Sequence, residues 1–179
     1  YTLSDNVRIG ASWLYLSGKP GGSKNQTIIK QRISAAEMVR ICQPDLSCID
    51  KSSTFNIAGK DIFGNCSKPG GNFHIDPYGD ISFCCYITDP NLRYDLTRGT
   101  FAEYWEDFLP KATEQIEKNV VPPVECFNCP NQSYCSWCPA YSYLEHARYD
   151  AKIDYLCTLS HQTEKLHKEQ LRNHQRFFQ

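Results

Sequence analysis

Apolar and polar residues alternate most regularly over residues 73–83. The apolar positions lie on both sides of a short polar segment: Phe73, Ile75, Ile81 and Phe83. That segment, Asp76-Pro77-Tyr78-Gly79, has proline second and glycine fourth, which favours a type I turn. The pattern predicts a β-hairpin. Cys66 precedes its first strand and Cys84 follows its second, so we expect the two sulfur atoms to approach one site.

An amphipathic helix is predicted after the hairpin. Thr100 and Glu103 have the spacing of a capping box. The apolar residues that follow Thr100 are aromatic and recur at helical spacing: Phe101, Tyr104, Trp105 and Phe108. Such a stripe is more typical of a protein core than of a cofactor-binding surface. We expect Pro110 to kink or end this helix, residues 111–120 to continue as a polar, exposed helix, and Pro122-Pro123 to break it.

The N-terminal segment predicts one strand and one short helix. Residues 7–16 are apolar, β-branched and aromatic, as in a buried strand. Residues 17–24 are rich in Gly, Ser and Pro and predict a loop. Ser34 and Glu37 form a second capping-box pattern, which opens a helix through Ile41. A single strand and helix cannot bury themselves, so we interpret this stretch as the end of a larger domain.

Two further helices are predicted in the C-terminal part. Pro139 suits the first turn of a helix that runs to about Tyr149. Residues 158–177 are charged and amide-rich, with leucines too widely spaced to form a broad apolar face. We expect a helix there that is mostly solvated or lies against a partner outside this sequence.

Composition narrows the class of protein. The hydrophobic content of 41% is sufficient for a packed core, and the net charge of -1 gives no reason to expect nucleic acid or an anionic membrane as a partner. The sequence shows no membrane-spanning run and no signal peptide. Its ten cysteines include two CxxC pairs and the vicinal pair Cys84-Cys85. This favours metal binding in a reducing, cytoplasmic compartment over a secreted disulfide protein, which remains the alternative.

Seven of the ten cysteines form one ordered pattern. It runs C-x12-G-x4-C, then C-x2-C-x5-C-x2-C, then a last cysteine eighteen residues later: Cys66, Cys84, Cys126, Cys129, Cys135, Cys138 and Cys157. These are too many ligands for one tetrahedral ion and nearly enough for two four-cysteine sites. A zinc ribbon would use the four central cysteines alone, across an unusually short gap, and would leave the other three without a role.

This pattern resembles the SPASM domain, the C-terminal auxiliary-cluster domain of radical S-adenosylmethionine enzymes that mature peptides and proteins. The resemblance covers residues 64–161 and includes the FHIDPYGDISFCC hairpin, the NLR segment at Asn91 to Arg93, the FAEYW helix and the CSWCPA block. The chain departs from the family in one gap. Ser136-Trp137 make it two residues where the family has three, a variant that we expect to be tolerated.

The resemblance implies two [4Fe-4S] clusters and a ligand set for each. The distal cluster would be held by what we call the distal set: Cys126, Cys129, Cys135 and Cys157. The proximal cluster would be held by the proximal set: Cys66, Cys84 and Cys138. The fourth proximal ligand has several candidates: Cys48 is the first, and Cys42 and Cys85 are the others. Alternatively, the fourth iron has no protein ligand and is open or bound by substrate. For Cys42 we favour the interpretation as a small buried hydrophobic residue of its helix.

Other residues near the ligands have two interpretations each. Four aromatic residues flank the cysteines, either as a low-dielectric shell around the clusters or as ordinary core residues: Phe83, Tyr134, Trp137 and Tyr141. His161, one turn past Cys157, is a candidate for contact with a ligand, although a surface histidine is the commoner case. The remaining histidines suggest no role.

The family implies a fold, a domain division and a function. We expect an α+β unit, a small β-hairpin with helices and cysteine-rich loops around two cluster sites. Residues 1–60 would be the end of a radical S-adenosylmethionine barrel and a bridging segment, and residues 61–179 the auxiliary domain. The chain lacks the C-x3-C-x2-C motif that binds the third cluster and S-adenosylmethionine, so alone it should not generate a radical.

The function expected for the full enzyme is oxidoreductase chemistry on a peptide or protein substrate. The auxiliary clusters would transfer electrons, position substrate, or both. The alternative is a structural zinc module for protein interaction, and zinc also enters such thiolate sites when iron is lost.

Overall fold

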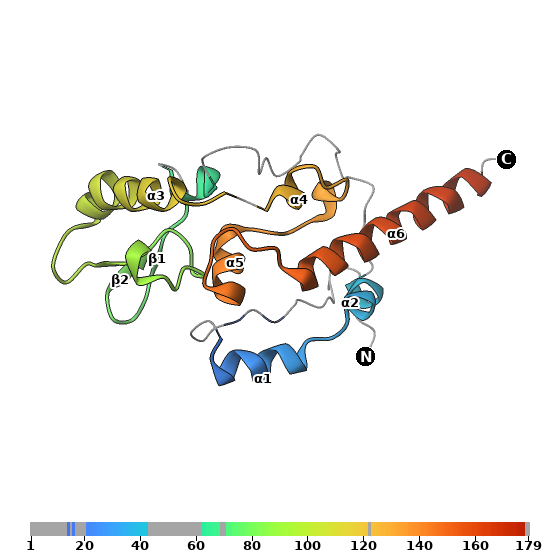
Figure 1. Cartoon of the computed structure of the whole chain (residues 1–179), viewed down its shortest axis with the longest axis horizontal. Helices are drawn as coiled ribbons and strands as arrows, with labels where there is room; N and C mark the ends of the chain where they lie inside the picture. The colour runs from blue at the N-terminus through green and yellow to red at the C-terminus, as the bar shows by residue number, and fades with distance from the viewer. Residues whose placement is uncertain are drawn as a thin grey trace, which may run out of the picture.

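The computed structural model describes residues 21–42, 62–68, 71–121 and 123–177, together with Leu14 and Leu16. These residues form an α+β fold in which helices surround one small antiparallel sheet (Figure 1). The sheet lies at one end of an elongated molecule, and the last helix, α6 (Asp154–Phe177), projects from the other end. The predicted fold class is thereby confirmed at the level of α+β.

The sheet contains the predicted hairpin and one strand that the sequence did not indicate. β1 (His74–Ile75) pairs antiparallel with β2 (Asp80–Ser82), which pairs with β3 (Tyr94–Asp95). The Gly79 N–H donates to the Asp76 carbonyl at 3.1 Å and closes the turn. Gly79 has a φ of +91°, in the left-handed region that favours glycine, so the residue is required there.

The aromatic helix is continuous through Pro110, so the expectation that it ends there is wrong. Residues of η3 (Glu103–Phe108) are π-helical and lead directly into α3 (Leu109–Glu117). The Leu109 N–H bonds the Tyr104 carbonyl, five residues back. A proline ring clashes with the carbonyl four residues before it in a regular α-helix, and the wider π turn relieves that clash. Pro110 then occupies the first turn of α3, where its missing N–H is not needed.

Both predicted capping boxes are present. The Thr100 N–H donates to Glu103 Oε2 at 2.7 Å, and the Glu103 N–H donates to Thr100 Oγ1 at 3.2 Å. The Ser34 N–H donates to Glu37 Oε2 at 3.1 Å, and the Glu37 N–H donates to Ser34 Oγ at 3.2 Å. The second box opens α2 (Ala35–Cys42), as expected from the sequence.

The N-terminal part differs from the prediction in one element. α1 (Ser23–Gln31) begins inside residues 17–24, which were predicted as a loop. That prediction is wrong from Ser23 onward. Of the strand predicted over residues 7–16, only Leu14 and Leu16 are described, and neither lies in a strand. The other residues of that strand lie outside the described part of the chain.

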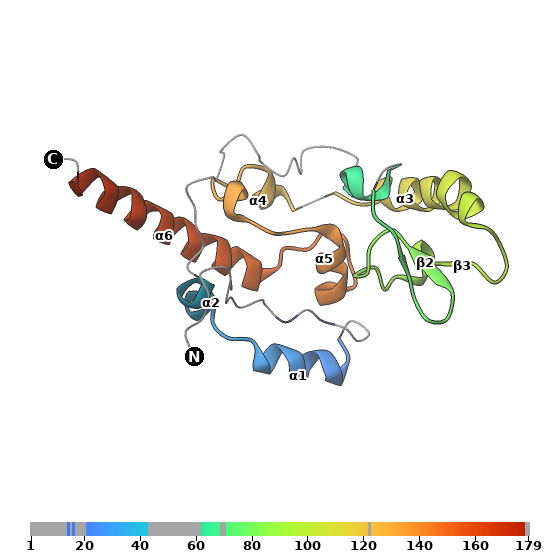
Figure 2. The ribbon, with the colours of Figure 1, turned by 180° about the vertical axis from the view of Figure 1, so that it is seen from behind.

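The C-terminal helices follow the prediction with shifted ends. α4 (Val124–Phe127) comes just before the cysteine-rich turns, and α5 (Pro139–His146) begins at Pro139 as expected. α5 ends a few residues early because Ala147 adopts a left-handed φ of 57°. Helix α5 lies between the sheet and α6 (Figures 1 and 2). α6 is confirmed and begins one turn before the prediction, at Asp154.

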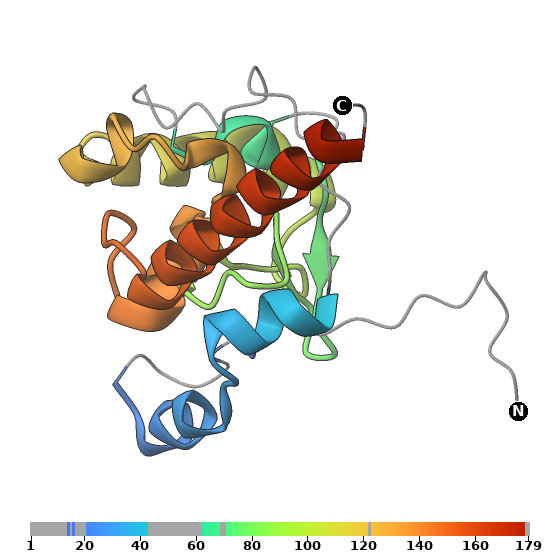
Figure 3. The ribbon, with the colours of Figure 1, turned by 90° about the vertical axis from the view of Figure 1, so that its right-hand side faces the viewer.

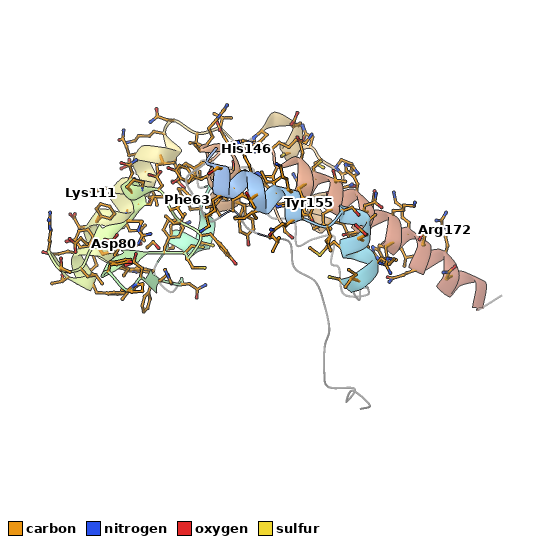
Figure 4. All side chains as sticks on the ribbon, turned by 90° about the horizontal axis from the view of Figure 1, so that it is seen from below. Phe63, Asp80, Lys111, His146, Tyr155 and Arg172 are labelled. Carbon is orange, nitrogen blue, oxygen red and sulfur yellow. The ribbon has the colours of Figure 1, made fainter. Side chains whose placement is uncertain are left out.

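Helix α2 packs against α6. Part of the C-terminal helix, which we expected to be mostly solvated or to lie against a partner outside this sequence, is therefore covered by the chain itself. Viewed from the end to which α6 projects, α2 lies below α6 and α1 lies further out (Figure 3). The Tyr155 hydroxyl donates to the Ile33 carbonyl at 3.1 Å and joins the start of α6 to the segment between α1 and α2. In Figure 4, Tyr155 lies between Asp80 at the sheet end and Arg172 on the projecting part of α6.

The described residues form two separate hydrophobic clusters. The first, which we call the sheet core, lies between the sheet, η3, α3 and α5 and includes Ile81, Phe83, Tyr104 and Leu109. The second, the α6 core, lies between α2 and the start of α6: Met38, Trp137, Ile153 and Leu156. In the described part of the chain, no helix has the length and apolar character needed to cross a lipid bilayer.

Candidate metal centres

The four cysteines of the distal set line one cavity. Cys126 lies in α4, Cys129 in the turn after it, Cys135 just beyond the 3₁₀ turn η4 (Gln132–Tyr134), and Cys157 on the first turn of α6. Successive turn hydrogen bonds bring the first three together: Cys129 N–H to the Cys126 carbonyl at 3.4 Å, and Cys135 N–H to the Gln132 carbonyl at 3.0 Å. Residues from three sequence regions thus converge on one space.

Two side-chain pairs attach the cysteine-rich turns to α6. Asn131, with 1% of its surface exposed, places Nδ2 2.6 Å from Nδ1 of His161. The Tyr134 hydroxyl lies 2.7 Å from Nδ1 of His167. His161 is exposed, which agrees with the interpretation as a surface histidine, and its ring contacts Asn131. The contact of His167 was missed, because nothing in the sequence relates it to Tyr134.

Three further residues line the cavity, and of these the sequence identified only Trp137 as a candidate. Gln132 donates from Nε2 to the Cys126 carbonyl at 2.5 Å, and Trp137 donates from Nε1 to the Ala151 carbonyl at 2.8 Å. Lys152 lies beside these groups and lines the same cavity. No spacing rule could have found Lys152, because its place depends on how the chain enters α6.

The three cysteines of the proximal set are electrostatic neighbours. Cys66 lies in the short turn η1 (Gly64–Ser67), Cys84 follows β2, and Cys138 is the N-cap of α5. The negative charges of Cys84 and Cys66 both contribute to raising the pKa of Cys138. Cys138 Sγ accepts the Tyr141 N–H at 3.4 Å. The hairpin and the start of α5 therefore bring these sulfur atoms to one region, next to the sheet core.

The candidates for a fourth proximal ligand differ in position. Cys48 lies outside the described residues, so that prediction is untested. Cys42 packs against the α6 core, with Sγ 3.9 Å from Met38 Sδ, beside the distal set. Cys85 is exposed, and its side chain interacts with Cys84. Of the described candidates, Cys85 alone adjoins the proximal set.

Burial makes four of these thiols hard to ionise by themselves, Cys126 and Cys135 in the distal set and Cys84 and Cys138 in the proximal set. It raises the pKa of Cys126 to about 11 and that of Cys138 to about 12, and the charges of neighbouring cysteines add to the effect. Burial also raises the pKa of Cys84 and of Cys135. Neighbouring thiolates repel one another unless a positive centre lies among them. The donor sets are therefore suited to a cationic ligand.

Within residues 21–42, 62–68, 71–121 and 123–177, no three His, Cys, Asp or Glu side chains lie close enough together to share a single metal ion. Comparison of the chain with family models, curated proteins and solved structures finds no match.

Proposed function

We propose that this chain is an auxiliary iron–sulfur domain that holds two [4Fe-4S] clusters, one on the distal set and one on the proximal set. The observation that carries the proposal is the division of the seven patterned cysteines into two neighbouring groups, each beside its own hydrophobic core. The division agrees with the ligand sets that the SPASM resemblance implies.

The chemistry of the donors supports iron–sulfur clusters. Each set consists of thiolates alone, which suit iron–sulfur clusters, and four thiols around one cavity match the four iron corners of a cubane. When bound, such clusters supply one-electron transfer. The protein contributes apolar surroundings, from Trp137 at the distal set and Phe83 in the sheet core, and backbone N–H donors such as that of Tyr141.

The proposal extends to the enzyme in which such a domain works. The domain would be part of a cytoplasmic radical S-adenosylmethionine maturase. It would transfer electrons, position a peptide or protein substrate, or do both. Residues 1–60 would belong to the end of the barrel and the bridging segment. S-adenosylmethionine and a third cluster would bind elsewhere in the full enzyme.

Single cysteine variants test the assignment of ligands. In protein reconstituted without oxygen, Cys129→Ala should remove about half of the iron and acid-labile sulfide, because one of two clusters loses a ligand. Cys66→Ala should affect the other half. Cys42→Ala is the matched control and should keep the full content, since Cys42 packs away from the proximal set. Full iron content in Cys129→Ala would show that the distal set is assigned wrongly.

A further inference from the structure

Lys152 is held in place at the distal cavity by the residues on both sides of it. The Ala151 carbonyl accepts the Trp137 indole N–H at 2.8 Å. Ile153 is 2% exposed in the α6 core, and its carbonyl accepts the Cys157 N–H at 2.9 Å. The backbone around Lys152 is thus tied to one cavity-lining residue and to one cysteine of the distal set. The side chain lines the cavity itself, and 39% of it is exposed.

Two carboxylates lie at ion-pair distance from the charged end of Lys152. Its Nζ lies 3.8 Å from Glu125 Oε1 and 3.9 Å from Asp154 Oδ1, both longer than a good hydrogen bond. The Asp154 side chain is 94% exposed, so water screens it strongly. Lysine side chains are cations at neutral pH, so Lys152 places a positive charge at the cavity.

We infer that Lys152 is a positioning residue that sets the reduction potential of the distal cluster by placing a fixed positive charge at its cavity. The inference rests on the proposed function. A cluster bound by four thiolates is anionic and becomes more negative when it takes up an electron. A nearby cation stabilises the reduced form more than the oxidised form and so raises the potential.

The test is a redox titration of the reconstituted protein followed by electron paramagnetic resonance. Lys152→Met removes the charge at similar length and should shift the distal cluster to a lower potential. Lys152→Arg keeps the charge and should restore the original value. The distal signal is identified as the one lost in Cys129→Ala, and the proximal signal should not move in the Lys152 variants.

A matched control separates local charge from net charge. Lys118→Met removes an equal charge from the end of α3, where Lys118 pairs with Glu114 at 3.0 Å, and should leave both potentials unchanged. An unchanged distal potential in Lys152→Met, or an equal shift in Lys118→Met, would overturn the inference.

Loss of the distal cluster is also informative. If Lys152→Met loses it while Lys152→Arg keeps it, the charge still acts on the cluster, as inferred. If both variants lose it, Lys152 has a packing role and the inference is wrong. A wild-type chain without acid-labile sulfide would overturn the proposed function and this inference together. Clusters that are present but insensitive to Lys152 would overturn this inference alone.

Discussion

Cys135 and Cys138 are three positions apart, yet they belong to different candidate sites. Cys135 lines the distal cavity and packs against the α6 core, whereas Cys138 packs against the sheet core. Both residues have extended backbone, with ψ angles of 128° and 158°. Three extended residues span at most about 11 Å between Cα atoms. This short covalent link would hold two bound clusters close together, as an electron relay requires.

Asn131 is the residue whose loss should most selectively affect the distal site. Its amide joins the cysteine-rich turns to His161 on α6 while the side chain is buried. Groups that orient metal ligands typically contribute about tenfold or more to metal affinity. We therefore expect Asn131→Ala to weaken retention of the distal iron by about tenfold, measured as transfer to a chelator without oxygen.

The control for this substitution is Asn119→Ala, at the exposed end of α3, where the amide donates only to the Gln115 carbonyl at 3.0 Å. Iron retention in that variant should equal the wild-type value. If Asn131→Ala and Asn119→Ala release iron at the same rate, Asn131 does not orient the distal ligands.

The sequence could identify the cysteines but not the residues that support them. Cysteine spacing is local, so the pattern alone could identify the seven cysteines, whereas their division into two sets is what the SPASM resemblance implies. Asn131, His167 and Lys152 reach the distal set only because α6 crosses the cysteine-rich turns. That crossing depends on tertiary packing, which no short-range pattern reports.

At the scale of elements, local sequence signals predicted where helices and turns begin better than where helices end. Both capping boxes and the hairpin turn appear as expected, because each depends on a few neighbouring residues. The alternative that the helix ends at Pro110 was wrong, since a π-helical turn carries the helix past the proline. α1 was missed because its apolar residues are few and the preceding segment is rich in glycine and proline.

A buried ion pair attaches the α1–α2 segment to the rest of the molecule. Arg32 bonds Glu145 of α5 through two nitrogens, one of them NH1 at 3.2 Å from Oε2, and the two side chains are only 6% and 8% exposed. The guanidinium also lies 5.4 Å from the ring centre of Tyr155. This network connects α5 and α6 to the segment that leads into α2.

Removing one partner of this pair should cost considerable stability. Arg32→Met leaves the Glu145 carboxylate buried without its partner, so we expect the free energy of unfolding to fall by about 3 kcal/mol. Urea unfolding of the reconstituted protein, followed by tryptophan fluorescence, measures this. Arg40→Met, on the exposed side of α2, is the control and should change stability by less than about 0.5 kcal/mol. Equal effects of the two variants would show that the ion pair does not stabilise the fold.

At the scale of the whole molecule, the described chain consists of two cores, each with one group of cysteines at its edge. α5 lies between them, with Cys138 at its N-cap and Ala140 and Leu144 buried along its length. Such a layout would fix two clusters relative to each other on a rigid element. In this layout the first CxxC pair, Cys126 and Cys129, lies wholly in the distal set, whereas Cys135 and Cys138 of the second pair lie in different sets.

The most direct test of this division is the content of iron, acid-labile sulfide and zinc per chain after reconstitution without oxygen. Two [4Fe-4S] clusters require about eight irons and about eight sulfides per chain, and this is the expected result. One or two zinc ions per chain without sulfide would contradict it and would support a structural zinc module instead.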